Sequence, residues 1–193
     1  IEVSQGIDLY VKQGNEISVT VEADENVYDI LMTEVKNEVL HIYFDKNVRK
    51  VNTKKVWVTV KDLQALQASS GADIVGESKL EGESIKLSSS SGADIKVQLD
   101  YNSVKASSSS GSDIYLSGTC NELYASSSSG SDIEAEELTS KSVTAESSSG
   151  SDIIVHATGS LDASASSGSD IICKGNPSNK NISKSSGGSV KMK

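Results

Sequence analysis

The sequence predicts an all-β fold: a single-stranded, right-handed parallel β-helix with coils of about 19 residues. First, the phrase Ser-Ser-Gly-x-Asp-Ile occurs seven times, the last copy degenerate, with its glycine at positions 71, 92, 111, 130, 150, 168 and 187. This period is too short for paired helices and fits one turn of a solenoid of short strands. Second, apolar residues alternate at a spacing of two around each phrase. Third, aromatic residues make up only 4% of the chain, which favours a thin core.

Each coil is expected to have two inward-facing strands, one on either side of the Ser-Gly corner. Leu87, five residues before a glycine, and Ile95, three residues after it, are examples of the apolar positions that recur from coil to coil. In the last coil the positions before the corner hold Lys180 and Ile182. Crossovers between parallel strands of one sheet are almost always right-handed, which favours a right-handed β-helix. A third, looser strand is indicated by Leu80, Leu99, Cys120, Leu138 and Ala157.

Residues 1–62 lack the serine phrase but still alternate like strands, at 7–11, 17–21, 39–44 and 56–60. A solenoid needs its first coil covered, so this region is expected to form wider opening coils that also act as a cap. No linker separates it from the seven coils of 63–193. The chain 1–193 is therefore expected to be one domain.

The glycine of each phrase is predicted to be a structural corner, because a sharp turn between strands often needs the positive φ that glycine adopts without strain. The two serines directly before each glycine should stack into columns whose hydroxyls pass hydrogen bonds along the axis. An alternative is a flat hydroxyl array that binds sugar or ordered water. The corner glycines are Gly71, Gly92, Gly111, Gly130, Gly150, Gly168 and Gly187.

One aspartate per coil is predicted to form an outward row, since the isoleucine that follows it points inward. Carboxylates about 4.8 Å apart repel by roughly 0.9 kcal/mol even in bulk water. Backbone N–H groups or serine hydroxyls are expected to offset this repulsion, assisted by Lys79, Lys96 and Lys105. The alternative is that Ca²⁺ ions bridge the row. No other cofactor is expected. The row comprises Asp73, Asp94, Asp113, Asp132, Asp152 and Asp170.

Charge and cysteine content exclude several protein classes. The formal net charge is −9 and Arg49 is the only arginine, so a nucleic-acid groove or an anionic-membrane patch is not expected. No apolar run reaches the roughly 20 residues of a membrane helix.

The chain starts at Ile1 rather than Met, which fits both a processed exported protein and a shortened fragment. Cys120 and Cys173 lie at different points of separate coils, so we expect buried free thiols rather than a disulfide.

The motifs together resemble one known family. Val56-Trp57-Val58-Thr59-Val60, then Asp62-Leu63, then the run of Ser-x-Gly-x-Asp-Ile/Val turns, are similar to the DUF2807 family, described as "putative auto-transporter adhesin" or "head GIN domain" proteins of Bacteroidetes-type bacteria. The resemblance covers nearly the whole chain. It implies a right-handed single-stranded β-helix exported to the periplasm or cell surface. The second glycine of the family's usual Gly-Ser-Gly-Asp turn is replaced here by Ala72, Ala93, Ser112, Ser131, Ser151 and Ser169, so this position need not take positive φ.

Two function classes remain after these exclusions. The favoured one is a non-catalytic exported or cell-surface adhesion module that presents repeated polar groups to a glycan or a surface protein. The alternative is a β-helix carbohydrate-active enzyme of the lyase or hydrolase kind. His41 and His156 have no Ser or Cys partner in a recognisable motif. Arg49, the only arginine, has no cluster of acidic residues around it in the sequence that would indicate a lyase site. Trp57 is expected to point outward between two inward valines. These observations favour adhesion.

Overall fold

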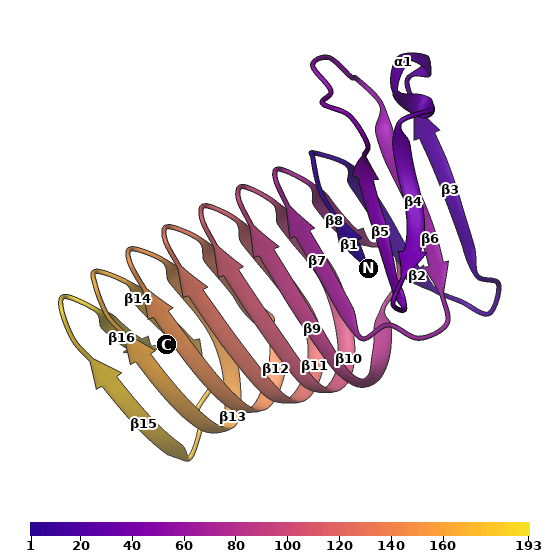
Figure 1. The fold of residues 1–193 in the computed structure, drawn as a ribbon. Helices are drawn as coiled ribbons and strands as arrows, with labels where there is room; N and C mark the ends of the chain where they lie inside the picture. The colour runs from indigo at the N-terminus through magenta and orange to yellow at the C-terminus, as the bar shows by residue number, and fades with distance from the viewer.

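The computed structural model describes all 193 residues and shows a right-handed β-solenoid with sixteen strands and one short helix (Figure 1). All the strands belong to one continuous sixteen-stranded sheet. The elements are β1 (Glu2–Val3), β2 (Asp8–Gln13), β3 (Ser18–Ala23), α1 (Glu25–Tyr28), β4 (Leu31–Lys36), β5 (Val39–Phe44), β6 (Lys54–Val60), β7 (Ala65–Ser69), β8 (Asp73–Gly76), β9 (Leu80–Ser90), β10 (Asp94–Ser109), β11 (Asp113–Ser128), β12 (Asp132–Ser148), β13 (Asp152–Ala165), β14 (Asp170–Lys174), β15 (Asn179–Lys184) and β16 (Ser189–Met192). No helix of the chain is long and apolar enough to span a membrane.

A regular coil is almost one continuous strand. β10 begins just after one corner and ends just before the next, and it pairs in parallel with β9 and β11. Ile95 lies against Ile114 and Ser108 against Ser127, which confirms the expected stacking of like residues. We call the segments before the corners the serine wall and those after the corners the aspartate wall.

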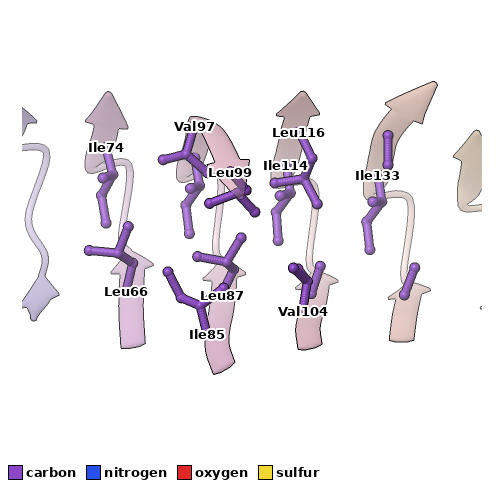
Figure 2. Packing of buried hydrophobic residues seen from close by; sticks show 14 of the residues in the cluster. Leu66, Ile74, Ile85, Leu87, Val97, Leu99, Val104, Ile114, Leu116 and Ile133 are labelled. Atoms are coloured by element: carbon purple, nitrogen blue, oxygen red, sulfur yellow. The ribbon is translucent and has the colours of Figure 1, made fainter. Parts of the chain in front are cut away.

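The core lies between the two walls as one cluster of 44 buried residues. Figure 2 shows Leu66 and Ile74 facing each other across one coil, and Leu87 in the next. The five residues expected on the third side are all buried, and they divide between two stacked columns. Leu99 pairs with Leu80 and Gly118, whereas Cys120 pairs with Tyr101 and Ser140.

An eighth corner, not expected from the sequence, lies at the start of the chain. Gln5 and Gly6 have φ of 61° and 74°, and β2 after them pairs in register with β8. Residues 1–13 therefore form a regular coil in which Gln5 replaces the usual serine. The signal in the sequence is Asp8, two residues after the glycine, as in the first six copies of the phrase.

The cap extends both walls beyond this coil. β5 continues the serine wall and β6 the aspartate wall in parallel, and β4 and β3 then add to them in antiparallel fashion. The opening region thus contains the first corner, one wider coil formed by β5 and β6, and two antiparallel strands, β3 and β4, that do not belong to a coil. The strands expected at 7–11, 17–21, 39–44 and 56–60 correspond to β2, β3, β5 and β6. β4 and α1 were not expected, and α1 closes one corner of the cap (Figure 1).

The last coil departs from the inward pattern. Lys180 and Ile182 stack on Leu161 and Ala163 of the preceding coil, as their positions require. Every residue of β15 is nevertheless exposed, because no further coil lies over it. The expectation that these two positions are buried is therefore wrong.

Both residues of each corner adopt the left-handed conformation, with φ of 60° at Ser129 and 65° at Gly130. Positive φ at two successive residues is the signature of a type I′ turn. A Cβ atom built on Gly130 would meet no atom within 4 Å, so the backbone conformation rather than crowding requires glycine. Ser131, in the position where the family usually has a second glycine, has no positive φ, as expected.

We expect Gly130→Val to lower the free energy of unfolding by about 2 kcal/mol, since a β-branched residue is strained at positive φ. For a chain of this size the change corresponds to a Tm lower by about 4–8 °C. Gly130→Asn should retain most of the stability, because asparagine tolerates this conformation. Thermal unfolding followed by circular dichroism measures both. A loss no larger than that of the exposed Ser164→Ala change would contradict the corner assignment.

Candidate functional site

Hydrogen bonds at the corners run through the backbone and through buried serines. The Gly111 N–H donates to the Ser129 carbonyl of the next coil at 3.3 Å, and the other corners from Gly71 to Gly168 repeat this bond. Inside the corner, the Ser108 hydroxyl lies 2.9 Å from the Ser112 hydroxyl, and two later coils hold the same buried pair at 2.8 Å. No hydrogen bond joins the hydroxyls of the serines directly before the glycines, so the expected hydroxyl relay along the axis is wrong. The hydroxyls that do bond to each other lie within one corner, at the positions three before and one after the glycine.

The aspartate row is one residue longer than expected. The six predicted aspartates lie in register, and Asp8 adds a seventh against Asp73. Each carboxylate in the middle of the row accepts a hydrogen bond from the backbone N–H of the next aspartate. These distances are 3.1 Å from Asp113 to Asp94, 3.2 Å from Asp132 to Asp113, 3.0 Å from Asp152 to Asp132 and 3.1 Å from Asp170 to Asp152.

Lysines pair only with the two ends of the row. Lys54 lies 3.5 Å from Asp8, and Lys191 lies 3.2 Å from Asp170. The three lysines expected to assist the row do not pair with it. Lys79 pairs with Glu81 and Asp100, Lys105 lies over the Tyr124 ring, and Lys96 forms no ion pair.

Burial and repulsion raise the pKa of two carboxyl groups in the row. Desolvation is the larger cause for both Asp73 and Asp132, and neighbouring aspartates add to it. A carboxyl group whose pKa is higher in the folded than in the unfolded chain stabilises the fold at acid pH. That contribution is lost as the pH rises through the folded pKa.

No group of three or more His, Cys, Asp or Glu side chains is arranged to hold a metal ion. The carboxylates of the row form a single line, and one oxygen of each member from Asp94 to Asp152 already accepts a backbone N–H. Calcium prefers six to eight oxygen ligands around one centre. The row therefore offers a poor calcium site.

A groove lies beside the row on the outer face of the aspartate wall, with a volume of about 310 Å³. We call it the Tyr115 groove. Its floor carries Lys96, Gln98, Tyr115 and Ser117 from β10 and β11. One side is formed by Val75 and Gly76, and the other by Glu134, Glu136 and Glu137.

Two irregular coils produce the groove. The floor belongs to the coils that follow Gly92 and Gly111, which both have the regular length. On one side β8 ends at Gly76, inside the long interval between Gly71 and Gly92. On the other side the pairing of β11 and β12 shifts register after Tyr115, and β12 lies inside the long interval that follows Gly130. The groove was not expected from the sequence. Longer coils on both sides of two regular ones are the signal that could have indicated it.

The groove offers groups that recognise polar, hydroxyl-rich ligands. Tyr115 is half-buried, and its hydroxyl lies 3.4 Å from an Asp113 oxygen, which orients the ring. Gln98 and Ser117 can donate and accept hydrogen bonds, and the glutamates accept them. Glu136 also pairs with Lys174, which holds one of the carboxylates in place.

The remaining candidate residues lie outside the groove. His41 is half-buried on the serine wall, 3.1 Å from Glu2, and Trp57 stacks on Tyr10 with a centroid distance of 5.3 Å. His156 lies on β13. Cys120 and Cys173 are buried free thiols, as expected, and burial raises the pKa of each. None of these residues forms a nucleophile and base pair with another.

We expect Asp132→Asn to raise the free energy of unfolding at pH 7 by about 0.5 kcal/mol, allowing for solvent screening of this partly exposed group. Asparagine keeps the oxygen that accepts the Asp152 N–H but removes a repelling charge. The gain should disappear below about pH 4, where the aspartate is protonated in both states. Thermal unfolding between pH 3 and 8 measures it.

Asp170→Asn is the matched control in the same row, because Asp170 is paired with Lys191. It should bring no gain at pH 7. Equal stabilisation by both changes, or a gain for Asp132→Asn that persists at pH 3, would contradict the assigned repulsion.

Solved structures with the same fold come from Bacteroides and Parabacteroides species. A "putative adhesin" of Bacteroides fragilis has a TM-score of 0.94 and 24% sequence identity, over 100% of this chain and 90% of that chain. A "putative lipid binding protein" of Parabacteroides distasonis has a TM-score of 0.76 and 20% identity, over 100% and 92%. A "putative adhesin" of Parabacteroides merdae has a TM-score of 0.71 and 18% identity, over 100% and 90%. At these identities the similarity establishes the fold.

A comparison with curated proteins found no match. A family model described as "Putative auto-transporter adhesin, head GIN domain" matches residues 1–177. That range includes the cap, the whole aspartate row and the Tyr115 groove. The chain therefore belongs to the DUF2807 family.

Proposed function

We propose that the protein is a non-catalytic, exported adhesion module that binds a neutral or amino-sugar glycan in the Tyr115 groove. The observation that carries this proposal is an oriented tyrosine ring on a flat, rigid floor, surrounded by amide, hydroxyl and carboxylate groups. An aromatic ring gives the apolar face of a sugar a surface to pack on, and the polar groups match its hydroxyls.

The charge of the groove indicates the class of glycan. Three glutamates line it and the aspartate row runs beside it, whereas Lys96 is the only cationic side chain in its lining. Negative charges in a cleft repel an anionic ligand and attract a cationic one. Acidic polysaccharides are therefore disfavoured, and neutral sugars or sugars with a free amino group are favoured.

The serine wall is a weaker candidate for the same function. A shallow hollow there is lined by Gln67 and eight serines from three neighbouring coils, with no hydrophobic residue. Its hydroxyls could contact a sugar, but no aromatic ring lines it. Ligand sites usually combine apolar contact area with a few polar groups, and of these two surfaces only the Tyr115 groove has both.

Export and adhesion are supported by the relatives. The family description names an auto-transporter adhesin, and two of the similar structures carry the word adhesin in their names. The proposed location is the periplasm or the cell surface. A long solenoid with one continuous sheet suits this role, because it presents a binding face on a rigid rod.

An enzyme that cleaves polysaccharides is the second candidate, because three carboxylates line the groove. Glycosidases use a carboxylate pair on opposite sides of the bond that they cleave. Glu134, Glu136 and Glu137 all lie on one side of the groove, and Glu136 is paired with Lys174. This arrangement favours binding without cleavage.

We expect the wild-type protein to bind neutral or amino-sugar glycans on a glycan array, and Tyr115→Ala to weaken the Kd of the best ligand at least tenfold. The loss of stacking area and of ring-face contact is the physical reason, since buried aromatic anchors dominate binding energy. Titration calorimetry with the array ligand measures the affinity. Chromatography of the glycan after incubation shows whether it is cleaved.

Tyr124→Ala is the matched control, because Tyr124 is a half-buried tyrosine of the serine wall, outside the groove. It should leave the affinity unchanged. Equal loss in both variants would contradict the assignment of the groove. Shortened glycan products that vanish in Glu134→Gln would replace adhesion by the enzyme hypothesis.

A further inference from the structure

An apolar cleft opens between the two walls of the cap, with a volume of about 600 Å³. We call it the cap cleft. Val19 and Val58 form a cross-strand pair on one side, and Val35 and Leu40 form another on the opposite side. Ten of the fifteen lining residues are hydrophobic, and Leu63 lies among them. The volume is within the roughly 300–1,000 Å³ typical of ligand sites.

The cleft exists because the cap has no third side. In the regular coils, buried residues such as Leu99 and Leu138 close the space between the walls. In the cap, α1 covers one corner, and the opposite side stays open (Figure 1). As a result Ile17 is 74% exposed and Val35 is 71% exposed, the largest values among the exposed large hydrophobic residues. Exposed apolar groups that line one cleft are typical of an interaction site.

A free strand edge borders the cleft. β3 hydrogen-bonds only to β6, and β4 only to β5, so each leaves one row of backbone N–H and C=O groups unpaired. Proteins commonly protect such edges with lysine, proline or a bulge. β4 ends in Lys36, whereas β3, with the sequence Ser-Val-Thr-Val-Glu-Ala, has none of these features. β3 is therefore the edge at which another strand can pair.

The rim of the cleft is acidic. Glu38 and Asp62 line it, and the only positive group among the lining residues is the Ile1 ammonium, which donates to the Ala65 carbonyl at 2.9 Å. An occupant with basic groups beside its apolar ones complements this rim, whereas the carboxylate of a fatty acid would be repelled.

We propose that the cap cleft is a docking site for an extended peptide segment of a partner protein, in which apolar and basic residues alternate. The segment adds as a strand to the free edge of β3, its apolar side chains enter between the walls, and its basic side chains lie near Glu38 and Asp62. Main-chain hydrogen bonds supply affinity in this mode of recognition, and the side-chain pockets supply specificity. This surface is separate from the Tyr115 groove and does not depend on the glycan proposal.

The test uses a short fluorescent peptide that alternates valine and lysine, with binding followed by fluorescence anisotropy. We expect saturable binding to the wild-type protein and a Kd at least tenfold weaker for Ile17→Lys, which places a positive charge at the mouth of the cleft. Ile182→Lys is the matched control: the same substitution at an exposed strand position of the last coil, with the same change in net charge. It should bind like the wild type.

Two further probes separate the possible occupants. A peptide of the same sequence with N-methyl groups on alternate residues cannot pair with a strand edge, and it should not bind. Equal binding of this peptide, equal loss in both Ile→Lys variants, or no saturable binding to the wild type would each overturn the proposal. Binding of a long-chain fatty acid that Ile17→Lys abolishes, without peptide binding, would replace the peptide by a lipid.

Discussion

The parallel hydrogen-bond ladder between successive coils is the constraint on which the rest of the structure depends. It places each residue directly over its equivalent in the previous coil, at a spacing of about 4.8 Å. Equivalent positions in successive coils therefore have the same surroundings and favour the same side chain. This explains the columns of isoleucine, buried serine and aspartate. The corners obey the same constraint, because the N–H of each corner glycine from Gly71 to Gly168 donates to the serine carbonyl of the next coil. A corner that changed shape would break the ladder on both of its sides.

A perfectly regular ladder gives flat faces, so recognition sites arise where the ladder is interrupted. The Tyr115 groove lies between the end of β8 and the register shift of β12. The cap cleft lies where the third side of the coil is missing. The regular coils between and behind these places give them a rigid base. Both sites thus use the solenoid as a support and use its irregularities for shape.

This division also explains how much the sequence could predict. The repeat indicated the solenoid, the corner glycines and the aspartate row, because periodic sequence gives periodic structure. The first corner was missed because Gln5 replaces serine in it. β3 was misread as part of a coil because alternation does not distinguish parallel from antiparallel pairing. The groove was missed for another reason. The longer intervals after Gly71 and Gly130 reveal the insertions, but not whether the extra residues turn inward or outward.

The aspartate row illustrates how one residue type can be both costly and required. An inner carboxylate repels its neighbours by roughly 0.9 kcal/mol each in bulk water, yet it also accepts a backbone N–H of the next coil, and hydrogen bonds to charged groups contribute about 1.5–3 kcal/mol. The two effects nearly balance, which permits an unbroken row. At the ends the balance changes, because neither Asp8 nor Asp170 accepts an N–H from a following aspartate. Lys54 and Lys191 pair with these two residues, so each end of the row carries a cation.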